Sequence, residues 1–371
     1  MFLWRSCRAV TTARTSPVLR SPGWTRFNST AVTKHHDPLR ILFCGADEFS
    51  IYSLIALYEL QQRRSDQVAS IDVLCRPDKR TGRGLKQISE VPIKGIASEL
   101  ELELHQIDTF KDWQPPKPFD LIVAVSFGLL VPARLINGAQ YGGLNLHPSL
   151  LPDLRGPAPI QHTLLRQRAS TGITLQTMHP TRFDHGMILD QEEAPVPPQS
   201  TPEDLVDMLG PLGARMLAKG VESGIFVPPL TDFANSGSPT IEPSHAPKIT
   251  PEDRHIDWKS WTAEMVQTRD RVLGRLWDST TFASCMDDSP TATAKRINYI
   301  GPWTVHPAIP PRDIVPRPGL PVLLPDQKST SLGIWSADAQ LMVPQGVTID
   351  GEPKAGAGQK LAHALRKRRG A

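Results

Sequence analysis

The sequence is poor in cysteine and lacks long apolar runs. Its 371 residues include four cysteines whose spacing fits neither a disulfide framework nor a metal site, so we expect reduced, buried thiols at Cys7, Cys44, Cys75 and Cys285. No stretch approaches the ~18 consecutive apolar residues that a membrane helix needs. We therefore expect no membrane partner.

Two kinds of cofactor site are also missing. The 11 histidines include His35 and His36, but no H-x-x-x-H or C-x-x-C motif occurs, so no metal is expected. The first strand–turn–helix pattern offers a single glycine, Gly45, where a dinucleotide-binding fingerprint needs three. NAD is therefore not expected as a cofactor.

Acidic residues are absent before Asp37, whereas arginine, serine and threonine are frequent there. This composition predicts a mitochondrial transit peptide over residues 1–36, and hence a location in the mitochondrial matrix. The alternative is a disordered basic tail on a cytosolic protein. The segment carries six positive charges, and its removal changes the formal net charge from +3 to 3 − 6 = −3. Contact with nucleic acid must then come from local basic patches.

Hydrophobic patterning predicts an α/β domain over residues 37–226. Short apolar runs that end in glycine or a turn alternate with helical periods, which is typical of a Rossmann-like, open, mostly parallel sheet with helices on both faces. The hydroxyl of Thr201, followed by Pro202 and two acids, predicts the start of a long helix that ends near Gly224. Residues 92–104 also have a helical pattern.

The composition changes at residue 227. Proline, serine and few apolar residues predict a linker over 227–250. Beyond it, short strand-like runs separated by proline and glycine predict a smaller, OB-like β-barrel domain over 251–371. Its basic tail, residues 360–371, favours phosphate if it lies at a helix end, and the alternative is a solvated helix terminus.

The stretch from Gly142 to Gln161 is the centre of the predicted site. Because side chains alternate along a strand, Leu144 and Leu146 point to one face, and Asn145 and His147 to the other. Pro148 then stops the strand, since proline has no N–H to donate. An open α/β sheet binds its ligands beyond the carboxyl ends of its strands, so we expect a ligand site here.

A candidate carboxylate, Asp184, lies in the connection of a predicted hairpin, 184 − 147 = 37 residues after His147. An aspartate close to a glycine in such a loop is most often a turn residue, and the spacing alone leaves both roles open. With Asn145 and His147 it completes a set that suits the transfer of an acyl group between amines, because the tetrahedral oxyanion needs donors and the attacking amine must lose a proton. A Ser/His/Asp hydrolase is the alternative, but Ser149 lacks a G-x-S-x-G elbow.

Residues 76–92 combine five cations with glycine and proline and show no apolar period, which predicts a basic loop. Such a loop can neutralise phosphates and fold on its partner. The alternative is a solvated surface loop.

Several motifs together resemble the methionyl-tRNA formyltransferase family of the mitochondrial type. The main one is G-x-N-x-H-P-S-L-L-P-x-x-R-G-x-A-P-I-Q, from Gly143 to Gln161, and others are ILFCGADEF (41–49), RPDKRTGRG (76–84), SFGLLVP (126–132), Phe183-Asp184-x-Gly186 and HIDW (255–258). The resemblance covers roughly residues 40–260 and is thin beyond them.

The resemblance implies a formyl donor, 10-formyltetrahydrofolate, and methionyl initiator tRNA as the acceptor. It implies that Asn145, His147 and Asp184 are catalytic. It also implies a folate site formed by Phe127, Gly128, Ser149, Leu150, Leu151 and Pro152, and tRNA contacts from Lys79, Arg80, Arg83 and Lys86. The second domain would hold the tRNA further along, and we expect a monomer.

Two other functions remain open from the sequence. A folate-dependent formyltransferase that acts on a small amine, such as a purine-pathway ribonucleotide, would share the three catalytic residues but need neither the basic loop nor the second domain. A relative that lost catalysis would bind RNA without folate turnover.

Overall fold

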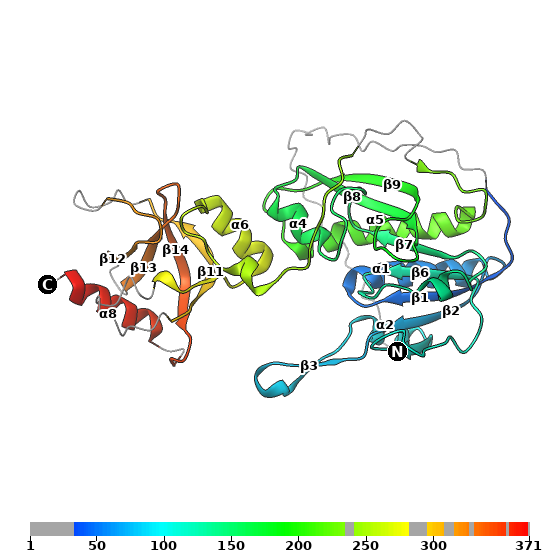
Figure 1. Ribbon diagram of the computed structural model, residues 1–371, viewed down its shortest axis with the longest axis horizontal. Helices are drawn as coiled ribbons and strands as arrows, with labels where there is room; N and C mark the ends of the chain where they lie inside the picture. Colours follow the sequence, from blue (N-terminus) through cyan, green and yellow to red (C-terminus); the bar gives the residue numbers. More distant parts are fainter. Residues whose placement is uncertain are drawn as a thin grey trace, which may run out of the picture.

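The computed structural model describes residues 33–233, 241–281, 295–307, 315–325, 330–353 and 356–369, which form two sheets with separate hydrophobic cores (Figure 1). Cys44 and Cys75 are free and buried, as predicted, and Cys7 and Cys285 lie outside the described residues. Burial raises the pKa of both thiols, that of Cys75 to about 11. No helix in the described ranges is long and apolar enough to cross a membrane.

The larger sheet has seven strands in the order β5-β2-β1-β6-β7-β8-β9. The pairs from β5 to β7 are parallel, and β8 runs antiparallel to both β7 and β9. The predicted Rossmann-like, mostly parallel sheet is therefore confirmed. The strands are β1 Leu39–Gly45, β2 Val68–Cys75, β5 Glu103–Gln106, β6 Leu121–Val125, β7 Gly143–His147, β8 Ser170–Thr177 and β9 Ile188–Pro195.

Both faces of this sheet are covered, because its central strands are apolar on both sides. In β1, Ile41 and Phe43 belong to one buried cluster, whereas Leu42 and Cys44 belong to another on the opposite face. The first cluster includes residues of four helices of this domain, which are α1 Glu48–Arg63, α2 Ile93–Glu99, α4 Pro159–Leu165 and α5 Pro202–Ser223. Val272 and Leu273, at the end of α6 Ala263–Leu273, also belong to it. The second cluster includes Leu135 and Ile136 of the short helix α3 Ala133–Ile136.

Helix α5 begins and ends as the sequence predicts. The Thr201 hydroxyl accepts a hydrogen bond from Asp204 N (3.1 Å), and the Asp204 carboxylate accepts one from Thr201 N (2.8 Å). This reciprocal capping box satisfies two backbone donors that the first turn leaves without helical partners. Gly224 follows the last turn with φ +66°, in the left-handed region that favours glycine.

Two predictions about local structure are wrong. The helical pattern of 92–104 ends at Glu99, because Glu101 turns the chain with φ +55° and the alternating residues that follow form edge strand β5. The basic segment is not a plain loop but a hairpin of β3 Lys79–Thr81 and β4 Gln87–Ser89, joined by the short 3₁₀ helix η1 Arg83–Leu85. Both strands are fully exposed, so no apolar alternation marks them in the sequence.

The second sheet is antiparallel, with five strands in the order β10-β11-β14-β13-β12. It confirms the predicted smaller β domain, and its edge strands β10 and β12 do not pair with each other in the described part of the chain. Trp258, Tyr299 and Trp303 pack together in its core. The elements are η3 Pro251–Arg254, α6 Ala263–Leu273, β10 Trp277–Asp278, β11 Ile297–Val305, β12 Pro321–Pro325, β13 Thr330–Trp335, β14 Leu341–Ile349 and α8 Ala357–Arg369.

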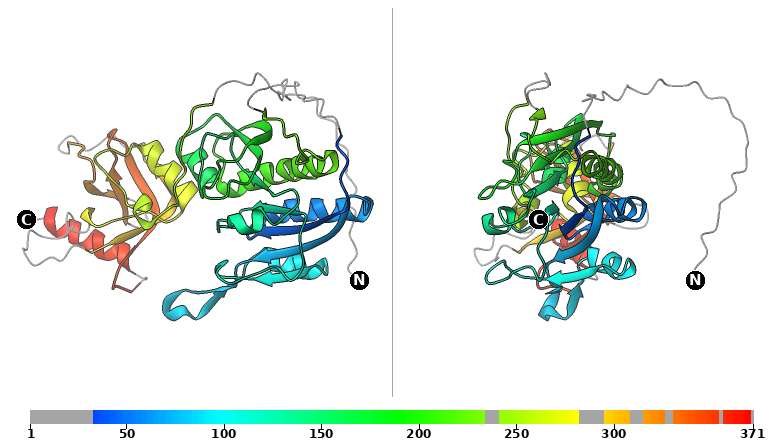
Figure 2. Two further views of the ribbon diagram at one scale, coloured as in Figure 1. Left: turned by 45° about the vertical axis from the view of Figure 1, so that its right-hand side comes forward. Right: turned by 90° about the vertical axis from the view of Figure 1, so that its right-hand side faces the viewer.

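The basic hairpin and the second domain project from the same side of the larger sheet, and α6 lies between the two domains (Figures 1 and 2). Helix α6 packs against α4 of the first domain. Of the predicted linker, residues 241–250 lie along the first domain, and residues 234–240 lie outside the described residues.

Candidate active site

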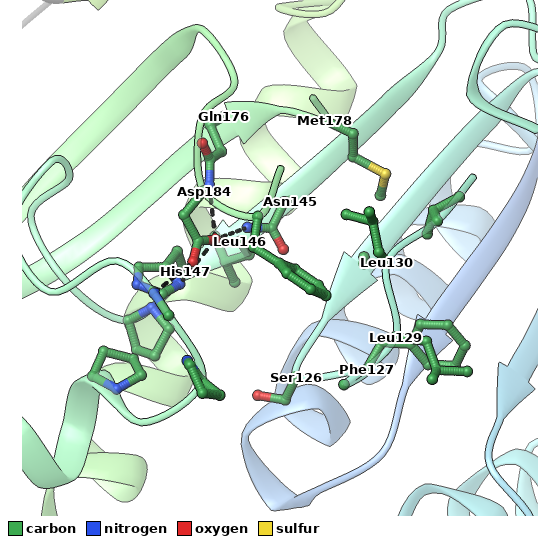
Figure 3. Close-up of a pocket in the computed structure, with 18 of the residues that line it drawn as sticks. Ser126, Phe127, Leu129, Leu130, Asn145, Leu146, His147, Gln176, Met178 and Asp184 are labelled. Carbon is green, nitrogen blue, oxygen red and sulfur yellow. Dashed lines mark hydrogen bonds and ion pairs between the residues drawn. The ribbon is translucent and has the colours of Figure 1, made fainter. Parts of the chain in front are cut away.

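A cavity of about 390 Å³ lies at the carboxyl edge of the larger sheet. Residues that follow β1, β6 and β8 line it, together with the end of β7 (Figure 3). In the sheet, β2 and β5 lie on one side of β1, and β6 and β7, which come later in the sequence, lie on its other side. The cavity therefore lies at the switch point of strand order, where open α/β sheets bind ligands.

Strand β7 directs Asn145 and His147 into the cavity. Leu144 and Leu146 are buried in the hydrophobic core, so alternation turns the two polar residues the other way, as predicted. Asn145 faces Gln176 across the antiparallel β7–β8 pair.

Asp184 reaches the same place from the β8–β9 connection. Its Oδ1 accepts hydrogen bonds from Asn145 Nδ2 (3.2 Å) and Gln176 Nε2 (3.3 Å), and lies 3.4 Å from His147 Nδ1. Its Oδ2 accepts from Gly156 N at 2.8 Å. The side chains of Asp184 and His147 are each 7% exposed. The structure thus brings together all three residues expected to be catalytic, and Figure 3 shows them on one wall with Leu129 and Leu130 on the other.

The His147 ring lies between two hydrogen-bond acceptors. Nε2 lies 3.0 Å from Leu154 O, and a carbonyl oxygen can only accept, so Nε2 carries a proton. Nδ1 faces the Asp184 carboxylate, which also only accepts when it is ionised. A proton on Nδ1 would let the ring donate on that side as well.

The sequence reasoning missed Gln176, Gly156 and Asp47. The side-chain amide of Gln176 makes two hydrogen bonds: Nε2 donates to Asp184, and Oε1 accepts from Gly186 N (3.1 Å). Gln176 therefore ties the end of β8 to the part of the β8–β9 connection that carries Asp184. Gln176 could be recognised as a site residue only from its position in β8 opposite Asn145, and that position is known only when the register of the two strands is known. Gly156 contributes a backbone N–H, which no side-chain pattern reveals.

Asp47 is a partly buried carboxylate on the cavity wall that caps α1. Its side chain accepts from Ser50 N at 3.1 Å, and burial raises the pKa of this carboxyl above its usual range although that hydrogen bond acts in the opposite direction. A polar residue directly after the first strand was a usable signal, because the carboxyl ends of parallel strands share one edge of the sheet.

The apolar wall of the cavity comes from the turn after β6. Ser126 and Gly128 both have positive φ, +50° and +77°, which is uncommon for serine and marks a tightly constrained turn. Phe127 and Gly128, two of the residues expected to bind folate, line the cavity, with Leu129, Leu130 and the strand-end residue Met178 beside them.

The other four expected folate residues, Ser149–Pro152, do not line this cavity. The Ser149 hydroxyl donates to Asp153 O (2.7 Å), and the Thr174 hydroxyl donates to Ser149 O (2.7 Å) and accepts from Leu151 N (3.0 Å). After Pro148 this segment is therefore joined to β8 through Thr174.

The residues expected to contact tRNA lie away from the cavity, on the basic hairpin. Lys79, Arg80 and Lys86 are exposed, and Arg83 begins η1. Two large apolar side chains of the hairpin, Leu85 and Ile88, are also exposed, by 58% and 63%. Exposed lysine and arginine side chains are the groups that contact phosphates in nucleic-acid complexes.

One group within the described ranges has metal-ligand geometry: Asp72, Glu103 and His105, at the outer edge of the sheet. Asp72 is buried there and lies 3.2 Å from His105 Nε2 and 3.8 Å from Lys117 Nζ. These ion pairs account for the burial of the carboxylate without a metal.

Comparison with known proteins places the chain in a family. A family model described as formyl transferase matches residues 39–220. The mitochondrial methionyl-tRNA formyltransferase of Saccharomyces cerevisiae is 32% identical over 314 residues, which are 74% of this chain and 77% of that protein. The chain belongs to the methionyl-tRNA formyltransferase family. This confirms the resemblance found in the sequence.

Other relatives of this formyltransferase extend the likeness. The mitochondrial methionyl-tRNA formyltransferase of Bos taurus is 34% identical over 259 residues, 69% of this chain but 62% of the bovine protein. The chain thus spans less than two thirds of that relative. Among solved structures, an N-formyltransferase from Helicobacter canadensis is 14% identical with a TM-score of 0.48, covering 82% of this chain and 98% of that one.

Proposed function

We propose that this formyltransferase transfers a formyl group from 10-formyltetrahydrofolate to the amino group of methionyl initiator tRNA, for the initiation of mitochondrial translation. The observation that carries the proposal is that Asn145 Nδ2 and His147 Nδ1 both lie within 3.4 Å of Oδ1 of Asp184. They do so in a chain of this family.

The site residues match the needs of this transfer. The amine nitrogen attacks the formyl carbon, the carbonyl oxygen becomes an oxyanion, and the bond from the formyl carbon to the donor nitrogen then breaks. Asn145 Nδ2 uses one hydrogen for Asp184 and keeps a second for the oxyanion. The Nδ1–H of His147 has a long contact with Asp184, and such contacts in a free enzyme often shorten or shift when substrate binds. Both donors act where charge develops.

Asp184 has the complementary role. It holds the charge state of the His147 ring and lies where it can guide the proton that leaves the attacking amine. That proton ends on the donor nitrogen when the carbon–nitrogen bond breaks, so the transfer balances without a metal. The 7% exposure of Asp184 keeps bulk water from this exchange.

The positions of the remaining predicted residues support separate roles. Phe127 and Gly128, with Met178, offer an apolar wall for the flat ring system of the folate. Ser149–Pro152 contact strand β8 through Thr174, and so help to hold the strand that carries Gln176. The hairpin cations Lys79, Arg80, Arg83 and Lys86 contact the phosphates of the tRNA, and the second domain holds the same tRNA on that side.

A transferase that acts on a small amine is the second candidate, because it would use the same three residues. The exposed basic hairpin and the second domain favour the tRNA, since a small substrate has no use for either. An RNA-binding relative without catalysis is disfavoured by the complete set of hydrogen bonds at Asp184.

Formylation of charged initiator tRNA by the purified protein tests the proposal. We expect labelled formyl from 10-formyltetrahydrofolate to reach methionyl-tRNA, and no transfer when the methionine amino group is acetylated beforehand. A higher kcat/KM with a small ribonucleotide amine would favour the second candidate, and tRNA binding without any folate turnover would favour the third.

We also propose a matrix location, with the transit peptide within residues 1–36. The acid-free composition supports this, and so do the mitochondrial relatives. A reporter fused to residues 1–36 should enter mitochondria, whereas a cytosolic signal would contradict the proposal.

A further inference from the structure

The linker between the domains is seated against the loop beneath the active site. Ser244–Ala246 run parallel to residues 152–158, with Arg155 paired with His245. Four backbone hydrogen bonds join the segments: Ser244 N to Pro152 O (3.2 Å), Arg155 N to Ser244 O (3.0 Å), Ala246 N to Arg155 O (2.6 Å) and Ala158 N to Ala246 O (3.3 Å). Ala246 is fully buried, so this part of the linker is a docked strand and not a free tether.

Side chains strengthen this contact, mainly through Ser244. Its hydroxyl accepts from Leu154 N (3.1 Å) and Arg166 Nη1 (2.9 Å), and it donates to Asp153 Oδ1. Arg166, at the end of α4, also donates to the carbonyl of His245. The linker strand is thus held between the loop and α4.

The same loop residues that meet the linker also meet the catalytic residues. Leu154 O faces His147 Nε2 at 3.0 Å, Arg155 Nε donates to Asp184 O at 2.9 Å, and Gly156 N donates to Asp184 Oδ2 at 2.8 Å. One three-residue segment therefore connects the linker on one side to His147 and Asp184 on the other.

The backbone of this segment needs support from outside. Leu154 has φ +57°, in the left-handed region that leucine rarely adopts. Gly156 has φ +120°, and a Cβ there would lie 2.6 Å from Ala246 O, so the linker approaches too closely for any other residue. Uncommon backbone conformations persist when the surrounding structure fixes them, and here the linker supplies part of that support.

We propose that Ser244–Ala246 position His147 and Asp184, so that the linker completes the active site. The proposal rests on the catalytic roles given under Proposed function. Ser244 acts through Leu154, whose carbonyl fixes His147 Nε2, and does not act on the substrate. Because this strand continues into η3 and the second domain, the catalytic geometry depends on how that domain is attached.

The first test compares linker variants of the full chain in formyl transfer. Ser244→Ala should lower kcat by about 10- to 100-fold, because small displacements of catalytic groups have effects of this size. KM for the tRNA should stay within about twofold. Ser244→Thr keeps the hydroxyl and should recover most of the rate. Thr250→Ala is the matched control, since it also removes a linker hydroxyl, but one whose partner is Asp253.

The second test does not depend on activity. Ring signals of His147 in ¹³C-histidine-labelled protein, assigned with His147→Ala, should move in Ser244→Ala and in Arg166→Gln but not in Thr250→Ala. If Ser244→Ala fails to fold, Arg166→Gln decides, because Arg166 lies on the exposed face of α4. Unchanged kcat and ring signals in a folded Ser244 or Arg166 variant would overturn the proposal. A wild-type protein that transfers no formyl would instead overturn the proposed function, and the ring signals would still decide the positioning.

Discussion

At the scale of single residues, the site is a set of hydrogen bonds around one carboxylate. Strand alternation was enough to predict that Asn145 and His147 share a face. The role of Asp184 came from the family motif, because spacing alone did not separate it from a turn residue, and the structure shows that it has positive φ and is also bonded to the other two. Gln176 could not be predicted, because a glutamine within an apolar strand has no signal until the register places it opposite Asn145.

Replacement of His147 tests whether this residue acts in the chemical step and not in tRNA binding. His147→Ala should lower the single-turnover rate of formylation by about 10²- to 10⁴-fold, because the imidazole donates and steers protons in the transition state. The Kd for tRNA should change less than about threefold, since the ring is 7% exposed at the cavity and distant from the hairpin. Filter binding measures the second quantity. A parallel loss of binding and rate would make His147 a structural residue.

At the scale of elements, short pieces at the sheet edges were the hardest to predict. The central strands and α5 follow from apolar runs and capping residues. The helix predicted over 92–104 failed because a single turn at Glu101 converts an apparent helical period into a strand. The hairpin of β3 and β4 failed because strands exposed on both faces have no apolar alternation.

The start of β6 is joined to β1 by a partly buried ion pair with a defined pH dependence. Arg40 donates to Asp120 from its backbone N, Nε and Nη2, at 2.7 to 2.9 Å, and these bonds hold the pKa of the Asp120 carboxyl below its usual range. A lowered folded-state pKa stabilises the protein above the unfolded pKa of ~3.9, and the effect is lost as pH falls through the folded value. Asp120→Asn should reduce the free energy of unfolding by about 1–2 kcal/mol at pH 7. Urea denaturation should show this difference shrinking below about pH 4, and a constant difference would contradict the assignment.

The basic hairpin should contribute electrostatic contacts to tRNA binding. Neutralising Lys79, Arg80 and Lys86 to glutamine should raise KM for tRNA and lower the slope of log Kd against log salt by roughly 0.7–0.9 for each phosphate that the variant no longer neutralises. Exchange of the exposed Leu85 for serine leaves the charges in place and is the control for the slope. An unchanged slope in the triple variant would remove the hairpin from the interface.

At the scale of the whole molecule, two domains with separate cores are connected by segments that look like tethers in the sequence. Proline and serine predicted a linker, but Ser244–Ala246 are docked on the catalytic loop. The end of the predicted transit peptide is docked as well. Lys34 N donates to Ser223 O at 2.9 Å, and Lys34 Nζ donates to the carbonyls of Val227 and Pro229, both at 2.6 Å.

These contacts predict that processing occurs upstream of Lys34. A chain that begins at residue 33 should be more stable than one that begins at residue 37 by about 1–3 kcal/mol, because the shorter chain loses the charged hydrogen bonds of Lys34 and the packing of His36 on Phe226. Thermal unfolding of the two chains measures the difference, and Lys34→Met in the longer chain isolates the ammonium group. Equal stability would contradict the stabilising role of Lys34, and amino-terminal sequencing of protein from mitochondria would show the processing site itself.

Periodicity, capping residues, charge and motifs were enough to predict the fold class, the family and the shared strand face of Asn145 and His147. Each of these signals is a property of residues that are close together along the chain. The tertiary structure alone decided which distant segments meet. It placed Asp184 and Gln176 on Asn145, moved Ser149–Pro152 out of the cavity, and seated the linker and Lys34 on the first domain. The physical reason is that these contacts join residues far apart in the chain. Those of the linker and of Lys34 end on backbone carbonyl and N–H groups, which every residue carries, and those of Asp184 and Gln176 depend on the strand register, so side-chain identity does not reveal either kind of partner.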